Sequence, residues 1–335
     1  MISATEGGMW AGRLRDLGLA VRRRLATVWT RDADSLATPV AHEGGDTIYA
    51  LDRHVEPVLV AEIERWGEPV CVIAEGFGAE GRLEIGAPGG AARYRLIIDP
   101  IDGTRGLMYD KRSAWFLAAV ARNRGEATSL AETFAAALVE LPTSKQAWAD
   151  SFSAYVGGGV DAQRLCWDPP GQRPLQPRPS RATTLKDGFA HVANFFPGTK
   201  VLASELMERI VAATLGKVCP GSGDVFDDQY ISSGGQMAEL ILGHDRFCGD
   251  LRPLFYRLLE RTAGDTTRGL ECHPYDVAGA LVAREAGVII TDGLDRPLDC
   301  PLNVQHPVHW CGYANEALHR QIAPVIQAWL RERGL

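Results

Sequence analysis

Two aspartates follow an apolar, strand-like run in the segment Ile97-Ile98-Asp99-Pro100-Ile101-Asp102-Gly103-Thr104. Because Pro100 cannot donate a sheet hydrogen bond, we expect the strand to stop there. A turn can then bring Asp99 and Asp102 together while the carbonyl of Ile101 points inward. Two carboxylates crowded into a dry site would force one of them to take a proton, and a divalent cation removes that conflict. Ligands that offer only oxygen suit Mg²⁺ or Mn²⁺ rather than Zn²⁺.

Gly103 and Thr104 come directly after this pair of acids. If a helix begins at this step, its free backbone N–H groups form an anion site beside the cations. Cations and a helix N-terminus around one oxyanion are what phosphoryl transfer requires, because that reaction needs positioning and charge neutralisation more than covalent chemistry. The segment therefore indicates a phosphate site.

Three further acids stand where a rigid element ends or begins. Glu75 follows the apolar run that ends at Ala74, Asp276 lies in a Pro-Tyr-Asp segment, and Asp52 precedes a predicted helix. Each has a simpler interpretation when taken alone. Glu75 could be a surface acid at a strand end, and Asp276 and Asp52 could be helix N-caps. The Asp-Pro-x-Asp-Gly segment by itself is a good turn sequence. The occurrence of all four acidic segments in one chain and in this order favours a shared site over these simpler interpretations.

In that order the chain resembles the inositol monophosphatase family, a superfamily of magnesium-dependent, lithium-sensitive phosphatases that includes fructose-1,6-bisphosphatase. The resemblance covers roughly residues 45 to 125 and 230 to 330, and the pair of signatures in this order is highly specific. The matching segments are 97–104 for the first signature, Tyr275-Asp276-Val277-Ala278-Gly279-Ala280 followed by 284–292 for the second, Ala74-Glu75-Gly76 for Gly-Glu-Glu, 46–52 for the acidic segment before the second helix, and Gly312-Tyr313-Ala314-Asn315 before the last helix.

The resemblance implies a ligand set for two or three Mg²⁺ ions. Glu75, Asp99 and the carbonyl of Ile101 would hold the first ion. Asp99, Asp102 and Asp276 would hold the second, with Asp99 bridging the two. A third, weaker ion would depend on Glu75. Mn²⁺ could replace Mg²⁺ at these sites.

The resemblance also implies catalytic and phosphate-binding roles. Asp52 and Thr104 would orient and deprotonate the attacking water, and Glu75 is the third expected catalytic residue. The backbone amides of Gly103 and Thr104 would bind the phosphate. No phosphoenzyme is expected.

The chain departs from the family pattern where the substrate would be recognised. After Asp-Gly-Thr the family has one variable residue, then Asn-Phe and a Gly-x-Pro turn, whereas residues 105–113 of this chain differ from that pattern. Arg105, Lys111 and Arg112 in this segment could bind a second anionic group or form a solvated basic turn. The stretch from 243 to 276 is longer than the family norm. Glu271 is the nearest candidate for the acid that faces inositol in the family. We expect Arg105, Glu271 and Ser232 to contact the substrate.

The predicted elements indicate a layered α/β fold. We expect an antiparallel sheet with two helices in an N-terminal domain, residues 1–185, and a smaller α/β domain, residues 186–335. The proline-rich stretch 168–181 is predicted to be a loop without regular structure. Apolar periodicity predicts helices around 14–28, 52–66, 205–215, 234–242, 275–286 and 315–333.

Composition limits the partners. The net charge of −7 argues against broad attraction to nucleic acid or anionic lipid. No apolar run approaches the ~20 residues that span a bilayer, and the first 30 residues lack the order of a signal peptide. The seven cysteines are scattered without a C-x-x-C pair, which favours reduced thiols in the cytoplasm. We expect a cytoplasmic homodimer that acts on a small phosphorylated metabolite.

The leading functional hypothesis is a phosphatase for an inositol or sugar monophosphate. A fructose-1,6-bisphosphatase or a 3′-phosphoadenosine phosphatase of the same superfamily is the nearest alternative. A non-catalytic regulatory protein that keeps the fold is a third possibility, but the intact acids argue against it. No G-x-G-x-x-G follows a predicted strand, which disfavours a Rossmann nucleotide-binding protein.

Overall fold

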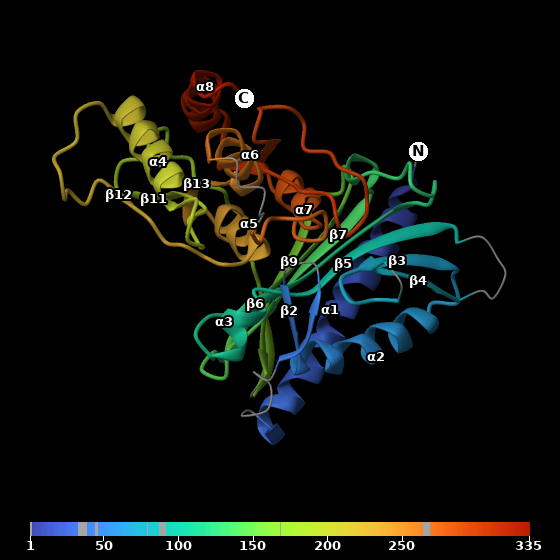
Figure 1. The fold of residues 1–335 in the computed structure, drawn as a ribbon. Coiled ribbons are helices and arrows are strands. Elements are labelled where there is room, and N and C mark those ends of the chain that lie inside the picture. Colours follow the sequence, from blue (N-terminus) through green and yellow to red (C-terminus); the bar gives the residue numbers. More distant parts are fainter. Residues whose placement is uncertain are drawn as a thin grey trace.

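The computed structural model describes residues 2–32, 39–43, 46–78, 80–86, 92–167, 169–263 and 269–335, and of residues 29–32, 39–43, 46–53, 262 and 263 it describes the backbone alone. Two β-sheets and three groups of helices alternate in layers (Figure 1). The layered α/β class predicted from the sequence is confirmed. The domain boundary predicted at residue 185 falls between the last strand of the first sheet and the first strand of the second, and it stays a prediction.

The first sheet has eight strands in the order β10-β9-β8-β7-β6-β5-β3-β4. All neighbouring strands are antiparallel except β3 and β5, which run parallel, so the sheet is mixed where the sequence predicted an antiparallel one. Its strands are β3 (Val70–Ala74), β4 (Arg82–Ile85), β5 (Tyr94–Asp102), β6 (Ala114–Arg122), β7 (Ala135–Leu141), β8 (Trp148–Tyr155), β9 (Val160–Trp167) and β10 (Pro170–Pro174).

The second sheet has five strands in the order β12-β11-β13-β15-β14. Strand β11 is parallel to β12 and β13, and β15 is antiparallel to β13 and β14. A separate antiparallel pair, β1 (Pro39–Glu43) and β2 (Asp46–Tyr49), precedes the first sheet. The strands of the second sheet are β11 (Gly188–Val192), β12 (Val225–Phe226), β13 (Asp245–Asp250), β14 (Ile289–Asp292) and β15 (Trp310–Tyr313).

The helices form the outer layers and the layer between the sheets. Helices α1 and α2 cover one face of the first sheet, α5 and α7 contact both sheets, and α4 and α8 pack together beyond the second sheet (Figure 1). The expected helices are confirmed, although α7 is shorter than predicted. The helices are α1 (Ala4–Asp32), α2 (Ala50–Glu64), α3 (Thr104–Met108), the 3₁₀ helix η1 (Leu130–Glu132), α4 (Lys200–Leu215), α5 (Ser233–Leu242), α6 (Arg252–Ala263), α7 (Ala280–Glu285) and α8 (Glu316–Glu332).

Strand β5 alternates between two hydrophobic cores, and this alternation directs the first aspartate. Leu96 and Ile98 are buried in the core beneath α1 and α2, whereas Ile97 is buried in the core between the two sheets. Because side chains alternate along a strand, Asp99 points to the same side as Ile97. The acid is thereby directed toward the layer that contains α5 and α7.

Two expectations about proline are wrong. Strand β5 does not stop at Pro100 but continues to Asp102, with an irregular register between Asp99 and Asp102 opposite β6. Pro100 fits because it lies in that irregularity, where one ladder donor is not needed. Residues 168–181 also contain a regular element, β10, which pairs with β9. Proline is tolerated there because β10 is an exposed edge strand.

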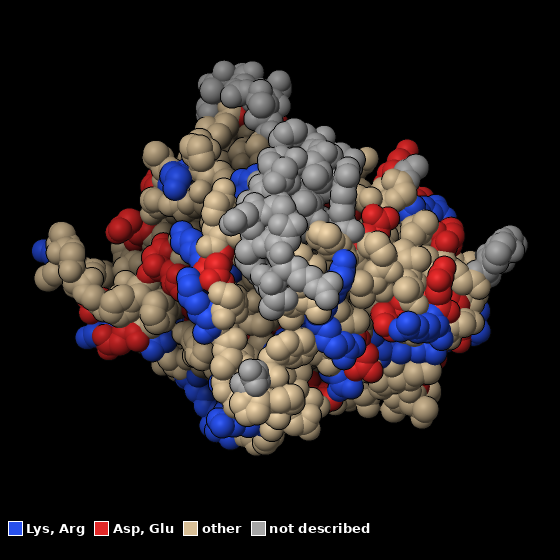
Figure 2. Space-filling model, turned by 90° about the horizontal axis from the view of Figure 1, so that it is seen from below, with Lys and Arg blue, Asp and Glu red and all other residues tan. Residues whose placement is uncertain are grey.

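The described surface is mixed in charge. On the face shown in Figure 2, Lys and Arg are interspersed with Asp and Glu, and neither sign forms one continuous field. All seven cysteines are free thiols. Within the described ranges, every helix is too short or too polar to cross a membrane.

Candidate metal centre

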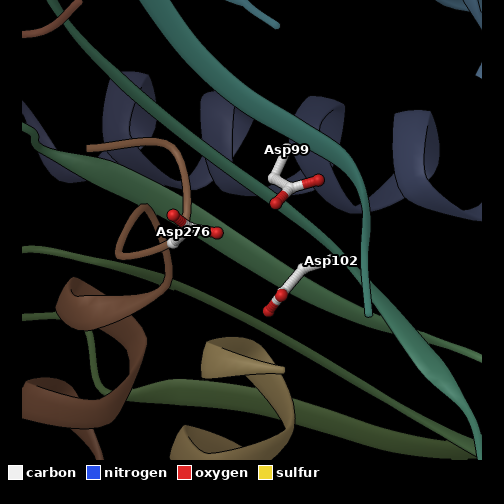
Figure 3. Close-up of side chains that lie close together, drawn as sticks. All are labelled: Asp99, Asp102 and Asp276. Carbon is white, nitrogen blue, oxygen red and sulfur yellow. The ribbon is translucent and has the colours of Figure 1, made fainter. Parts of the chain in front are cut away.

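Three aspartates from two distant segments converge between the sheets. Asp99 and Asp102 lie at the end of β5, and Asp276 lies in the turn before α7. One carboxylate oxygen from each of the three lies within 4.8 Å of the others. Figure 3 shows the three side chains directed toward a common point. Asp99 is 9% exposed and Asp102 is 7% exposed, so the site is largely removed from water.

Local backbone turns fix two of these carboxylates. The Ile101 N–H donates to Oδ1 of Asp99 at 3.0 Å, across the register irregularity of β5. The His273 N–H donates to Oδ2 of Asp276 at 2.6 Å. Successive short-range backbone hydrogen bonds between 273 and 280 shape this turn, which explains why α7 begins only after Gly279. Each carboxylate keeps one oxygen without these backbone bonds.

The third carboxylate, Asp102, is held by the start of α5. The Ser232 hydroxyl lies 2.9 Å from Oδ2 of Asp102, and the Gly234 N–H donates to the same oxygen at 2.6 Å. Ser232 is also the N-cap of α5, where its Oγ accepts from the Gly235 N–H. The structure therefore places Ser232, predicted to contact substrate, against a predicted metal ligand.

The electrostatics of the three acids show the conflict that a cation would remove. Burial, followed by the charges of Asp102, Asp276 and Glu75, raises the pKa of Asp99 well above its ordinary value. Burial raises the pKa of Asp102 to about 7, and burial and the charge of Asp102 raise that of Asp276. Crowded oxygen ligands of this kind fit a hard divalent cation, which favours the ionised form of all three.

Two further acids predicted to belong to the site are Glu75 and Asp52, and the structure describes the surroundings of Glu75 but not the side chain of Asp52. Glu75 lies just after β3, and its charge contributes to the raised pKa values of Asp99 and Asp276, so it stands beside the aspartates. The group whose oxygens lie within 4.8 Å of one another does not include it. Asp52 lies in the first turn of α2 rather than before the helix. Its side chain lies outside the described residues, so its catalytic role stays a prediction.

The predicted phosphate segment has the expected backbone. Helix α3 begins at Thr104, and Gly103 before it has a φ of 96°. A Cβ at Gly103 would lie 3.1 Å from both the carbonyl of Ile231 and Cβ of Ser232, so glycine is required for conformation and for space. The Thr104 hydroxyl donates to the Ile101 carbonyl at 2.7 Å. Two groups with predicted roles are thus in direct contact.

The predicted substrate contacts receive less support. Arg105 is exposed in α3, and its predicted role stays untested. Arg112 is engaged elsewhere, because its guanidinium forms two hydrogen bonds of 2.8 and 2.9 Å with the carboxylate of Asp228. The pKa of Tyr256 in α6 is raised by burial, then by the charge of Asp250 and then by that of Glu271. Glu271 therefore lies beside α6. Its role toward substrate stays a prediction.

One buried ion pair beside the aspartates was not assigned a role from the sequence. Arg252 at the start of α6 is 7% exposed and binds Asp250 through Nε and Nη2, at 2.9 and 2.5 Å. Its positive charge opposes the effect of burial on the pKa of Asp102 and Asp276. The sequence pattern that could have indicated this ion pair is an acid and an arginine two residues apart at the end of a buried apolar strand.

Comparisons with known proteins identify the fold. Neither a protein-family model nor a curated protein matches the chain by sequence. Solved structures do match: an inositol monophosphatase from Anabaena (14% identity, 96% of each chain covered, TM-score 0.59), the extragenic suppressor protein suhB of Bartonella henselae (15%, 97% of this chain and 99% of that one, 0.62) and a Leishmania major fructose-1,6-bisphosphatase (14%, 96% and 92%, 0.64). The chain therefore has the inositol monophosphatase fold, as its two sequence signatures predicted.

Proposed function

We propose that the chain is a Mg²⁺-dependent phosphomonoesterase that hydrolyses a small inositol or sugar phosphate. The observation that carries the proposal is the convergence of Asp99, Asp102 and Asp276 within 4.8 Å at the end of β5. A buried acidic cluster has no structural benefit of its own, since the charges of Asp102 and Asp276 raise the pKa of Asp99 and the charge of Asp102 raises the pKa of Asp276. The fold shared with inositol monophosphatases and a fructose-1,6-bisphosphatase supports the same conclusion.

The side chains around the cluster fit hydrolysis by water. Bound Mg²⁺ would neutralise phosphate oxygens and lower the pKa of a water molecule. The Thr104 hydroxyl already donates its proton to the Ile101 carbonyl, so its lone pairs are left to accept a hydrogen bond from the attacking water. The water oxygen forms a bond to phosphorus while the ester P–O bond breaks. The water gives up one proton, for which Asp52 is the proposed base, and the leaving alkoxide takes up one proton from solvent water and departs as an alcohol.

Asp99, Asp102, Asp276, Glu75 and the carbonyl of Ile101 are the proposed metal ligands. The backbone amides at Gly103 and Thr104 are the proposed phosphate contacts. The exposed Arg105 remains a candidate for contact with the part of the substrate beyond the phosphate.

Turnover of a panel of phosphomonoesters tests the proposal. Inositol phosphates, sugar phosphates, fructose 1,6-bisphosphate and 3′-phosphoadenosine 5′-phosphate are offered with Mg²⁺ and again with a chelator. We expect release of inorganic phosphate from at least one member, abolished by chelation and restored by Mg²⁺. Turnover that is unaffected by chelation would contradict the metal assignment. No turnover of any member, combined with no binding of Mn²⁺, would favour the non-catalytic alternative.

A further inference from the structure

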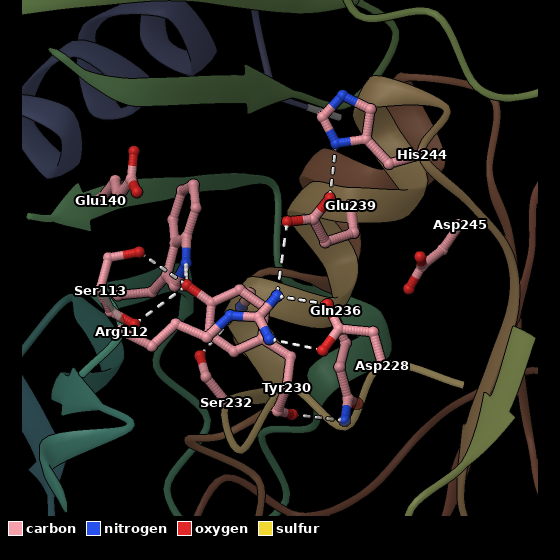
Figure 4. A network of polar contacts seen from close by, with 12 residues as sticks. Arg112, Ser113, Glu140, Asp228, Tyr230, Ser232, Gln236, Glu239, His244 and Asp245 are labelled. Carbon is pink, nitrogen blue, oxygen red and sulfur yellow. Dashed lines mark hydrogen bonds and ion pairs between the residues drawn. The ribbon is translucent and has the colours of Figure 1, made fainter. Parts of the chain in front are cut away.

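A network of polar contacts joins the first sheet to the start of α5. At its centre is Tyr230, which is 5% exposed (Figure 4). The Tyr230 hydroxyl donates to the Ser113 carbonyl at 2.9 Å and accepts from Trp115 Nε1 at 2.8 Å, and it lies 2.8 Å from the Ser113 hydroxyl. One donor and two acceptor positions are thus fully used, so the ring has a single orientation.

Two further groups pack against the Tyr230 ring. The Arg112 guanidinium carbon lies 3.7 Å from the ring centroid, and Asp228 holds that guanidinium through two hydrogen bonds. A Cβ at Gly235, in the first turn of α5, would lie 2.4 Å from the ring, so the ring packs against the backbone of the helix. The Tyr230 carbonyl accepts from Gln236 Nε2 at 2.9 Å. Tyr230 thus fixes where α5 begins.

The start of α5 is also what holds a metal ligand. The Ser232 hydroxyl and the Gly234 N–H both contact Oδ2 of Asp102. The backbone connects these two groups to Tyr230, and the Ser232 N–H donates to the Tyr230 carbonyl at 2.9 Å. A shift of the ring would therefore move both donors relative to the carboxylate.

We propose that Tyr230 is a positioning residue for the metal centre, acting through Ser232 and Gly234 on Asp102. The inference rests on the proposed metal site. Tyr230 itself contacts none of the three aspartates in the described hydrogen bonds. Groups that orient metal ligands from outside typically alter metal affinity about 10- to 100-fold when they are replaced. We expect Tyr230→Phe and Ser232→Ala each to weaken divalent metal binding by a factor in that range.

Binding of Mn²⁺ to the full chain, followed by electron paramagnetic resonance of the free ion, tests the proposal without a substrate. Tyr94→Phe is the matched control, because Tyr94 is also buried and its hydroxyl also makes a hydrogen bond, to Glu6 at 2.8 Å, but at the opposite end of β5. We expect the control to bind Mn²⁺ as the wild type does. Thermal melts in chelator separate a loss of affinity from a loss of folded protein.

The double variant Tyr230→Phe/Ser232→Ala supplies a readout that a general loss of stability would not produce. If Tyr230 acts through Ser232, the two effects on affinity are not additive, and Tyr230→Phe adds little once Ser232 is gone. Fully additive effects, or wild-type affinity in Tyr230→Phe, would overturn the proposal. If Tyr230→Phe does not fold, Arg112→Met, which removes the cation above the ring, must weaken Mn²⁺ binding instead. Failure of the wild type to bind Mn²⁺ would contradict the proposed function itself.

Discussion

The Gly234 N–H and the Asp102 carboxylate form a hydrogen bond of 2.6 Å between residues 132 positions apart. Asp102 ends β5 in the first sheet, and Gly234 lies in the first turn of α5 in the layer between the sheets. The position of a proposed metal ligand on one sheet thus depends on a helix that also packs against the other sheet. The geometry of the site therefore reports on the packing of the two sheets, not only on the local sequence around Asp102.

Gly234→Ala should disrupt this contact. A Cβ at that position would lie 2.4 Å from Cδ2 of Leu117, 3.0 Å from Cβ of Trp115 and 3.2 Å from Oδ2 of Asp102. Overpacking of this kind costs about 1–3 kcal/mol in the free energy of unfolding. We expect a lower melting temperature and weaker Mn²⁺ binding, measured by thermal unfolding and by titration.

Gly12→Ala in α1 is the control for this substitution. A Cβ at Gly12 would have no atom within 4 Å. Alanine is favoured over glycine in a helix by up to about 1 kcal/mol, so this variant should be as stable as the wild type or more so. Equal behaviour of the two variants would show that the close approach at Gly234 has no consequence.

The stability of the protein should depend on pH through Asp245. Burial, then the charges of Glu239 and Asp228, raise the pKa of Asp245 to about 7, against the opposing charges of His244 and Arg112. The folded state therefore holds a proton that the unfolded state has released, and stability falls as pH rises from about 4 to about 7. Asp245→Asn cannot ionise. We expect its melting temperature to exceed that of the wild type increasingly over this range.

Thermal melts at pH 4, 6 and 8 check this expectation with chelator present throughout. Asp161→Asn, at an exposed acid, is the control and should show the same pH dependence as the wild type. A constant difference in melting temperature between Asp245→Asn and the wild type from pH 4 to 8 would show that folding does not raise the pKa of Asp245.

Arg105 and Arg112 should behave differently although both lie just after the phosphate segment. Arg112 is held by Asp228 and by the Tyr230 ring, so Arg112→Ala should lower stability by roughly 1–2 kcal/mol and leave the ratio of activity on bisphosphate and monophosphate substrates unchanged. Arg105→Ala should raise KM for a substrate with two anionic groups by about ten- to a hundredfold, which is what one charged hydrogen bond contributes.

Steady-state kinetics of both variants on a monophosphate and a bisphosphate distinguish the roles. An equal loss on both substrates, with a lower kcat, would place Arg105 on the reacting phosphate instead. No change in either parameter would make it a solvated residue of the turn.

The sequence predicted the parts of the site that follow from local chemistry. Asp99 and Asp102 could be found because two acids directly after a buried apolar run conflict with burial unless something pairs with them. The helix start at the Gly103-Thr104 step was also predicted, and α3 begins at Thr104, whereas the left-handed φ of 96° at Gly103 was not predicted. The convergence with Asp276 came from the resemblance and not from spacing.

The parts that the sequence did not predict depend on tertiary packing. Nothing local distinguishes Tyr230 from any buried tyrosine, since its partners Ser113 and Trp115 lie more than a hundred positions away. Helix α6 was not predicted, because its stretch was seen only as an extension between 243 and 276. Strand β10 was missed because prolines at the two ends of an edge strand look the same as prolines in a loop.

The rate of phosphate release by Asp99→Asn, compared with that of the wild type at saturating Mg²⁺, tests whether the three aspartates form a catalytic metal centre. Asp16→Asn, at an exposed acid of α1, controls for the loss of one negative charge. We expect the rate of Asp99→Asn to fall to that of the wild type in chelator while the variant remains folded, and the rate of Asp16→Asn to equal that of the wild type. An Asp99→Asn variant that kept most of the wild-type turnover would contradict the assignment of this aspartate cluster as the catalytic metal centre.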